Sequence, residues 1–95
     1  KVTRDDHGYI MNSMIRLFAK SREVEQKLAM GFDKTADDDR YLLYGKLFYD
    51  RFMNLEVDLG LNDALDLGWK TLAECFRPDE VGIKQEFIDR YWPKQ

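Results

Sequence analysis

The chain has 95 residues, of which 44% are hydrophobic and 35% are charged, and its formal net charge at pH 7 is −3. This length limits it to one domain with enough apolar side chains for a core. Because lysines and arginines are scattered among acids, the composition disfavours nucleic acid and anionic membranes as partners. No stretch approaches the roughly 20 apolar residues of a transmembrane helix, which argues against membrane insertion.

The first predicted element is a long helix from about Asp5 to Met30. Thr3 or Asp5 can cap it, and Gly31 sits where a C′ glycine would end it. Ser21 interrupts its apolar stripe, which favours a bend or break there. The stripe consists of Ile10, Met14, Leu17, Val24 and Leu28, with Phe18 beside it.

A second helix is predicted to start after Thr35, the natural N-cap, with Asp38 completing a pattern that resembles a capping box. We expect it to end near Met53 or Asn54. The following segment, Leu55 to Leu61, contains a glycine and is interpreted as a connection. The apolar positions of the helix are Tyr41, Leu42, Leu43, Tyr44, Leu47, Phe48 and Phe52.

The third helix is predicted to begin with Asn62 as its cap and to present Leu65, Trp69, Leu72 and Phe76 inward. Pro78 either stops it or opens a short turn at the first helical position. A final helix is expected over Lys84–Trp92, with Phe87, Ile88 and Tyr91 facing inward. No strand alternation is sustained, so the sequence predicts an all-α bundle of about four to five helices with short connections.

The sequence offers little for catalysis. His7 is the only histidine and lies beside acids at a helix start, where capping and solvent exposure explain it. The single cysteine, Cys75, excludes an internal disulfide, and with one histidine a zinc site of these ligands is also excluded. Cys75 is therefore expected in the core, and nothing requires an oxidising compartment. A phosphate-binding glycine loop is absent. We expect no catalytic residue, no metal and no cofactor.

The turn before the second helix is the strongest candidate for an interaction. Its run Asp37-Asp38-Asp39 lacks the spacing and glycine of an EF-hand, so helix capping is favoured over metal binding. The same turn can be interpreted as an exposed tip that makes a moving contact with a basic partner. Trp69 is expected in the core, whereas Trp92 could belong to the core or to a binding platform.

Two runs carry a resemblance to a known family. They are Thr3-Arg4-Asp5-Asp6-His7 and Leu65-Asp66-Leu67-Gly68-Trp69, followed by residues Ile88 to Pro93. In this order they resemble the C-terminal helical domain of the B subunit, or beta chain, of V-type and A-type ATPases. The resemblance covers nearly the whole chain. The segments 55–63 and 77–82 depart from the family pattern, and the inward positions around them are kept.

The resemblance implies a role in a rotary machine. The chain, residues 1–95, would be the helical bundle of a larger subunit that also has a β-barrel and a nucleotide-binding domain. It implies a non-catalytic, regulatory role, and partners in the catalytic A subunit and the central stalk. The complex would couple ATP hydrolysis or synthesis to proton or sodium transport. The implied location is cytoplasmic, peripheral to the membrane, in the soluble head.

By the same resemblance, the acidic turn would face the central rotor. The rotor-contact candidates are Asp33, Asp37, Asp38 and Asp39. Exposed Coulomb contacts are worth about 0–1 kcal/mol each, which suits repeated making and breaking. Two alternatives stay open, a free-standing helical adaptor and, less favoured, a small enzyme. We also expect weak self-association of the isolated domain through exposed apolar side chains.

Overall fold

The computed structural model describes residues 3–53 and 60–94, without the side chain of Leu61. These residues form helices and no strand, which confirms the predicted all-α bundle. The elements in chain order are α1 (Arg4–Ala29), α2 (Ala36–Phe48), the π-helical turn η1 (Tyr49–Met53), α3 (Leu61–Cys75), the 3-10 turn η2 (Pro78–Glu80) and α4 (Gln85–Tyr91).

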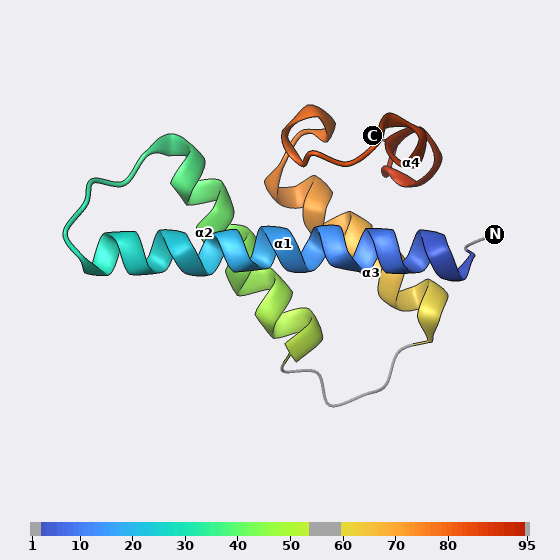
Figure 1. The fold of residues 1–95 in the computed structure, drawn as a ribbon, viewed down its shortest axis with the longest axis horizontal. Coiled ribbons are helices and arrows are strands. Elements are labelled where there is room, and N and C mark those ends of the chain that lie inside the picture. Colours follow the sequence, from blue (N-terminus) through green and yellow to red (C-terminus); the bar gives the residue numbers. More distant parts are fainter. Residues whose placement is uncertain (1–2, 54–59, 95) are drawn as a thin grey trace.

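Helix α1 runs along the longest axis of the molecule, which measures 45 Å (Figure 1). Both α2 and α3 cross it, and α4 lies near its amino-terminal end together with the carboxyl end of the chain (Figure 1). The turn that joins α1 to α2 is at the opposite end (Figure 1). The two ends of α1 therefore have different surroundings.

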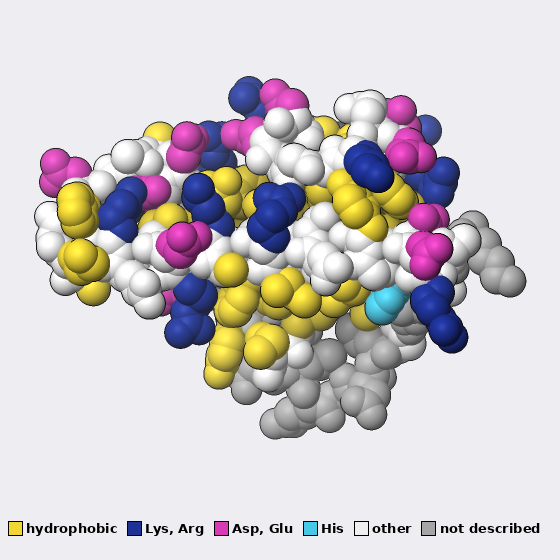
Figure 2. Space-filling view, in the orientation of Figure 1, with side chains coloured by type: hydrophobic (Ala, Val, Ile, Leu, Met, Phe, Trp, Pro, Cys, Tyr) yellow, Lys and Arg dark blue, Asp and Glu magenta, His cyan; other side chains and the backbone are white. Residues whose placement is uncertain are grey.

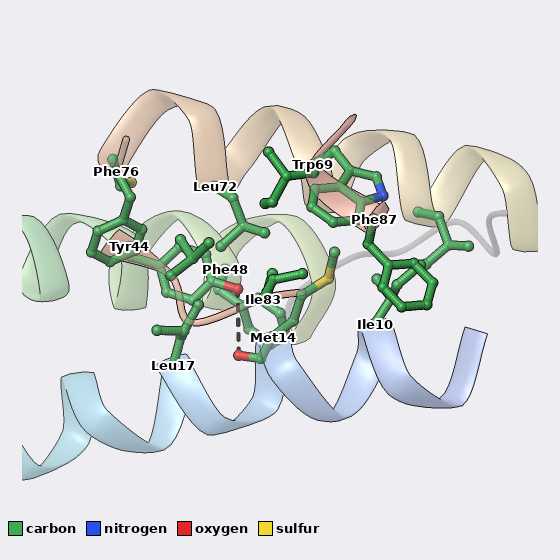
Figure 3. Close-up of a cluster of buried hydrophobic side chains, with 14 residues drawn as sticks. Ile10, Met14, Leu17, Tyr44, Phe48, Trp69, Leu72, Phe76, Ile83 and Phe87 are labelled. Atoms are coloured by element: carbon green, nitrogen blue, oxygen red, sulfur yellow. Dashed lines mark hydrogen bonds between the residues drawn. The ribbon is translucent and has the colours of Figure 1, made fainter. Parts of the chain in front are cut away.

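The core lies against the amino-terminal two-thirds of α1 (Figure 3). It comprises Ile10, Met14, Leu17, Tyr44, Phe48, Leu65, Trp69, Leu72, Cys75, Phe76, Val81, Ile83, Phe87 and Ile88. The Tyr44 hydroxyl donates a hydrogen bond to the Met14 carbonyl at 3.4 Å, and burial raises the pKa of Tyr44. Trp69 stacks on Tyr91. The predicted core positions of Trp69 and Cys75 are confirmed.

Helix α1 begins as predicted but does not break. The Thr3 Oγ1 accepts a hydrogen bond from the Asp6 amide at 3.1 Å, so Thr3 is the cap. The predicted bend or break near Ser21 is wrong, because α1 runs straight and unbroken over Arg4–Ala29 (Figure 1). Ser21 is fully buried there, and its hydroxyl donates to the Phe18 carbonyl at 2.7 Å. A Cβ at Gly45 would overlap Ser21 Oγ, so these two small residues let α1 and α2 cross closely.

The buried part of the apolar stripe of α1 ends before its last member. Leu28 lies four residues after Val24 on the predicted stripe but is only partly buried. Val24 is 5% exposed but lies outside the main core cluster. The core therefore does not extend to the last turn of α1.

The predicted boundaries between α2 and α3 are corrected in part. The helical segment after Thr35 ends at Met53 as predicted, but its last turn, η1, is widened to a π-helix. The N-cap of α3 is Gly60, so the prediction of Asn62 as cap is wrong by two residues. Gly60 makes no side-chain cap bond, and glycine is itself tolerated at this position. Residues 55–59 of the predicted connection lie outside the described residues.

The last quarter of the chain follows its prediction closely. Pro78 opens the turn η2, and α4 covers Gln85–Tyr91, one residue shorter at each end than predicted. Phe87 and Ile88 are buried, whereas Tyr91 and Trp92 are partly buried against the core. Within residues 3–53 and 60–94, no helix is both long and apolar enough to cross a membrane.

Candidate functional site

The turn between α1 and α2, residues 30–35, is shaped by its glycine. Gly31 has a φ of +94°, in the left-handed region that favours glycine. Its amide donates to the Leu28 carbonyl at 3.0 Å, and the Phe32 amide donates to the Lys27 carbonyl at 3.2 Å. This pair of bonds is a Schellman motif, which satisfies carbonyls at the end of α1. Gly31 is thus the predicted C′ residue.

The start of α2 is fixed by a capping box. Thr35 Oγ1 accepts from the Asp38 amide at 3.1 Å, and Asp38 Oδ2 accepts from the Thr35 amide at 3.0 Å. Lys27, from the last turn of α1, also donates to Asp38 Oδ2. The Lys27 bond first, and then the Thr35 amide, hold the pKa of Asp38 below its ordinary value. Asp38 therefore fastens the two helices to each other.

Asp37 and Asp39 point outward and pair locally. The Asp37 side chain is 73% exposed and accepts from Arg40, and this hydrogen bond is the main reason that the pKa of Arg40 is raised. Asp39 Oδ1 lies 2.9 Å from Lys34 Nζ. Arg40 also reaches Glu80 of η2, with 2.8 Å between Nη1 and Oε2. Bases from the same region therefore offset part of the acidic charge.

The expectation of an exposed, dense negative tip is corrected by this geometry. Asp38 is 6% exposed, so it is not available as a surface contact. Asp33 is exposed and, among the described residues, has no ion-pair partner. The structure thus places three of the four predicted contact residues on the surface, Asp33 in the turn and Asp37 and Asp39 in the first turn of α2, while the fourth, Asp38, is structural.

The sequence interpretation missed two apolar side chains of this turn. Met30 is 74% exposed and Phe32 is 60% exposed. They flank Gly31, and Figure 2 shows exposed hydrophobic side chains at the end of the molecule where this turn lies. Their exposure could have been predicted from their position on either side of a C′ glycine. Side chains at such a chain reversal have few neighbouring elements to cover them. The turn is therefore mixed in character, with exposed apolar and acidic groups.

The cysteine and the histidine, the other candidates for chemistry, lie in the core and in a helix start. Cys75 is 6% exposed, and burial raises the pKa of its thiol to about 11, so it stays protonated at neutral pH. His7 lies in the first turn of α1, and its side chain is partly exposed. Within the part of the chain that the structure describes, no three His, Cys, Asp or Glu side chains are placed to hold a metal ion.

Comparisons with known proteins place this geometry in a family. A family model described as the C-terminal domain of V and A type ATP synthase matches residues 1–92. A V-type ATP synthase beta chain of Protochlamydia amoebophila (strain UWE25) is 55% identical over 94 residues, which are 99% of this chain and 22% of that protein. A second such beta chain, of Borreliella burgdorferi (strain ZS7), is 52% identical over 93 residues, or 98% of this chain and 21% of that protein.

The chain thus spans about a fifth of the length of the curated relatives it matches, 22% and 21% in these two cases. No solved structure matches it.

Proposed function

The chain belongs to the family of C-terminal domains of V and A type ATP synthases, and we propose that it serves as the non-catalytic helical domain of a beta chain in the head of such a synthase. In this role it packs beside catalytic subunits, and the turn between α1 and α2 faces the central rotor. The complex couples ATP hydrolysis or synthesis to the transport of protons or sodium ions.

The observation that carries this proposal is the position and support of the turn. It lies at the far end of the 26-residue helix α1, away from the amino-terminal end and the core (Figure 1). The Schellman motif, the capping box and the Lys27–Asp38 ion pair hold it from both helices. A contact that is made and broken on every rotation of a rotor needs a connection between helices that keeps its shape without a partner.

The chemistry of the tip supports weak, repeated contacts. Asp33, Asp37 and Asp39 are exposed, so each offers about 0–1 kcal/mol to a passing basic side chain. Met30 and Phe32 add apolar area beside them. None of these five side chains belongs to the core cluster, so changes to them leave the bundle intact.

The test is a titration of the chain with purified central-stalk subunits of a V-type synthase at low and high salt. The informative variant is Asp37→Asn with Asp39→Asn, because Asp38 must be spared as part of the capping box. We expect binding that weakens with salt and weakens again, by roughly tenfold, when both carboxylates are neutralised, because each exposed pair contributes up to about 1 kcal/mol.

The matched control is Asp66→Asn, which neutralises an exposed acid on α3. It should bind like the unmodified chain. Absence of binding at low salt, or equal binding by the double variant and the control, would remove the rotor-facing role and leave the family assignment standing.

A further inference from the structure

Two buried polar atoms at the contact between α3 and α4 have no hydrogen-bond partner in the protein. They are Nε1 of Trp69 on α3 and the hydroxyl oxygen of Tyr91 on α4. Hydroxyls buried elsewhere in the bundle are paired, since those of Ser21 and Thr71 donate to backbone carbonyls at 2.7 and 2.8 Å. A buried group left unpaired loses the bonds that it makes with water in the unfolded chain, so native proteins rarely leave one.

The two atoms belong to neighbouring rings. Trp69 and Tyr91 stack with their ring centroids 5.6 Å apart and their planes 12° from parallel. Trp69 is 2% exposed, and Figure 3 shows its Nε1 on the edge of the indole that points toward the start of α3. A hydrogen bond is about 2.9 Å long, so one water molecule bridges polar atoms up to about 5.8 Å apart. The ring separation falls within this span, which favours one shared water over two separate ones.

The chemistry of the two groups selects a neutral ligand that both donates and accepts. An indole N–H only donates, whereas a tyrosine hydroxyl donates and accepts. Both rings pack in or against the apolar core cluster, where an ion would lose its hydration without meeting an opposite charge. The guanidinium of Arg90 lies over the Tyr91 ring but is already paired with Asp6 at 3.3 Å. A water molecule meets these requirements, because it can accept from Trp69 and either donate to or accept from Tyr91.

We propose that Trp69 Nε1 and the Tyr91 hydroxyl together hold one buried water molecule, which links α3 to α4. Helix α4 has seven residues and no side-chain cap bond, so it depends on tertiary contacts. The amide of Lys84, its N-cap, donates to the Tyr9 hydroxyl at 3.0 Å and joins it to α1. The water gives α4 a polar link to α3 as well. Both ligands belong to the bundle itself, so the inference goes beyond the proposed function and does not depend on it.

The direct test is a crystal structure of the chain and of its Tyr91→Phe variant. We expect one water peak within hydrogen-bond distance of both atoms in the unmodified chain, and no water at that place in the variant. A structure in which either atom bonds to a protein group, or in which no single water reaches both, would overturn the inference. A water that keeps its place in the variant would also overturn it, because Tyr91 would then not be a ligand.

A test in solution uses the direction in which the melting temperature changes. Tyr91→Phe removes one ligand of the water, so we expect the melting temperature to fall by about 4–8 °C, the shift for one net hydrogen bond in a domain of this size. Tyr9→Phe is the matched control, because it removes a hydroxyl with a direct protein partner, and it should fall similarly. An unchanged or higher melting temperature for Tyr91→Phe would mean that its hydroxyl is unpaired, and the inference would fail.

The indole proton of Trp69 reports on the same water by NMR. Phenylalanine keeps the stacked ring at position 91, so the variant changes the hydrogen bond more than the ring-current shift. We expect the Trp69 Hε1 resonance to move upfield in Tyr91→Phe, because hydrogen bonding moves a donor proton downfield. The chain has two tryptophans, and Trp92 serves as the internal reference. A Trp69 resonance that moves no more than that of Trp92 would count against the shared water.

Discussion

The two ends of α1 are held by different kinds of interaction. From Ile10 to Leu17 the helix is covered by α2, α3 and the carboxyl-terminal segment, and the inward apolar side chains Ile10, Met14 and Leu17 are no more than 2% exposed. From Val24 to Met30 the helix adds no side chain to the core cluster of the described residues, and the Lys27–Asp38 ion pair ties it to the start of α2. Apolar packing fixes one end, and caps with one partly buried ion pair fix the other.

Because of this difference, the stability of the bundle and contact with a partner depend on different ends of α1. The core end carries the cohesion of the bundle through its buried apolar side chains. The turn contributes little apolar burial, so its exposed residues can be tuned for a partner at little cost in free energy of unfolding. Substitutions at the two ends should therefore have effects of different magnitude and kind.

The largest effect is expected at Trp69, which is 2% exposed and stacks on Tyr91. Trp69→Ala should lower the free energy of unfolding by about 3–5 kcal/mol, because it removes a large buried side chain and leaves a cavity. Phe32→Ala, at the turn, should change it by less than about 0.5 kcal/mol. Urea unfolding followed by circular dichroism measures both. Similar losses of unfolding free energy in the two variants would show that the turn contributes to stability as much as the core does.

The next effect is expected where α1 and α2 cross. Gly45→Ala should destabilise by about 1–3 kcal/mol, because the new Cβ overlaps Ser21 and the helices must separate. Gly8→Ala is the matched control, since a Cβ there meets nothing within 4 Å. That variant should stabilise α1 by roughly 0.5–1 kcal/mol through helix propensity. Thermal unfolding of both gives the answer, and a stabilising Gly45→Ala would refute the close crossing.

A smaller and local effect is expected at the cap of α2. Thr35→Ala should cost about 1 kcal/mol by leaving the Asp38 amide without its side-chain acceptor. Hydrogen exchange should show the loss in the first turn of α2, with protection around Trp69 unchanged. If exchange rises evenly across the bundle instead, the two ends are not energetically separate.

The mildest effect is a pH dependence at the turn. The folded-state pKa of Asp38 is lowered, so its contribution to stability is complete above its ordinary value of 3.8 and is lost as the pH falls through the folded pKa. Asp38→Asn should therefore be less stable than the unmodified chain at neutral pH, and the gap should close on acidification. Lys27→Met should raise the pKa of Asp38, as NMR titration would show. An unchanged pKa would exclude Lys27 as its main cause.

Signals carried by neighbouring residues predicted much of this fold. The caps Thr3 and Thr35 and the C′ residue Gly31 were found from short spacings, and Trp69 was placed in the core by helical periodicity. The run Leu65–Trp69, which was used for the family resemblance, also has a structural role in this chain. Leu65 and Trp69 are buried in the core, and Gly68 lies against Met14 of α1.

The errors fall where a residue depends on a distant partner. Ser21 was expected to interrupt α1, but its burial depends on Gly45 in another helix. Asp38 was expected to face outward with its neighbours, but it turns inward to Lys27, which no local spacing reveals. The rotor contact of Asp33, Asp37 and Asp39 stays a prediction, since a partner surface leaves no trace in a single sequence.

The unbroken course of α1 through Ser21 has a mechanical consequence. Its 26 residues make a rod of about 39 Å, which packs on the core near one end, on α2 at the Ser21–Gly45 crossing, and is tied to α2 again by the Lys27–Asp38 ion pair. A rod without a hinge does not absorb a sideways push on its far end. It passes the push on as a torque about its support, so a displacement at Met30 becomes a force on the packing around Ile10. Stiffness, rather than any single contact at the turn, is what would let this domain transmit motion.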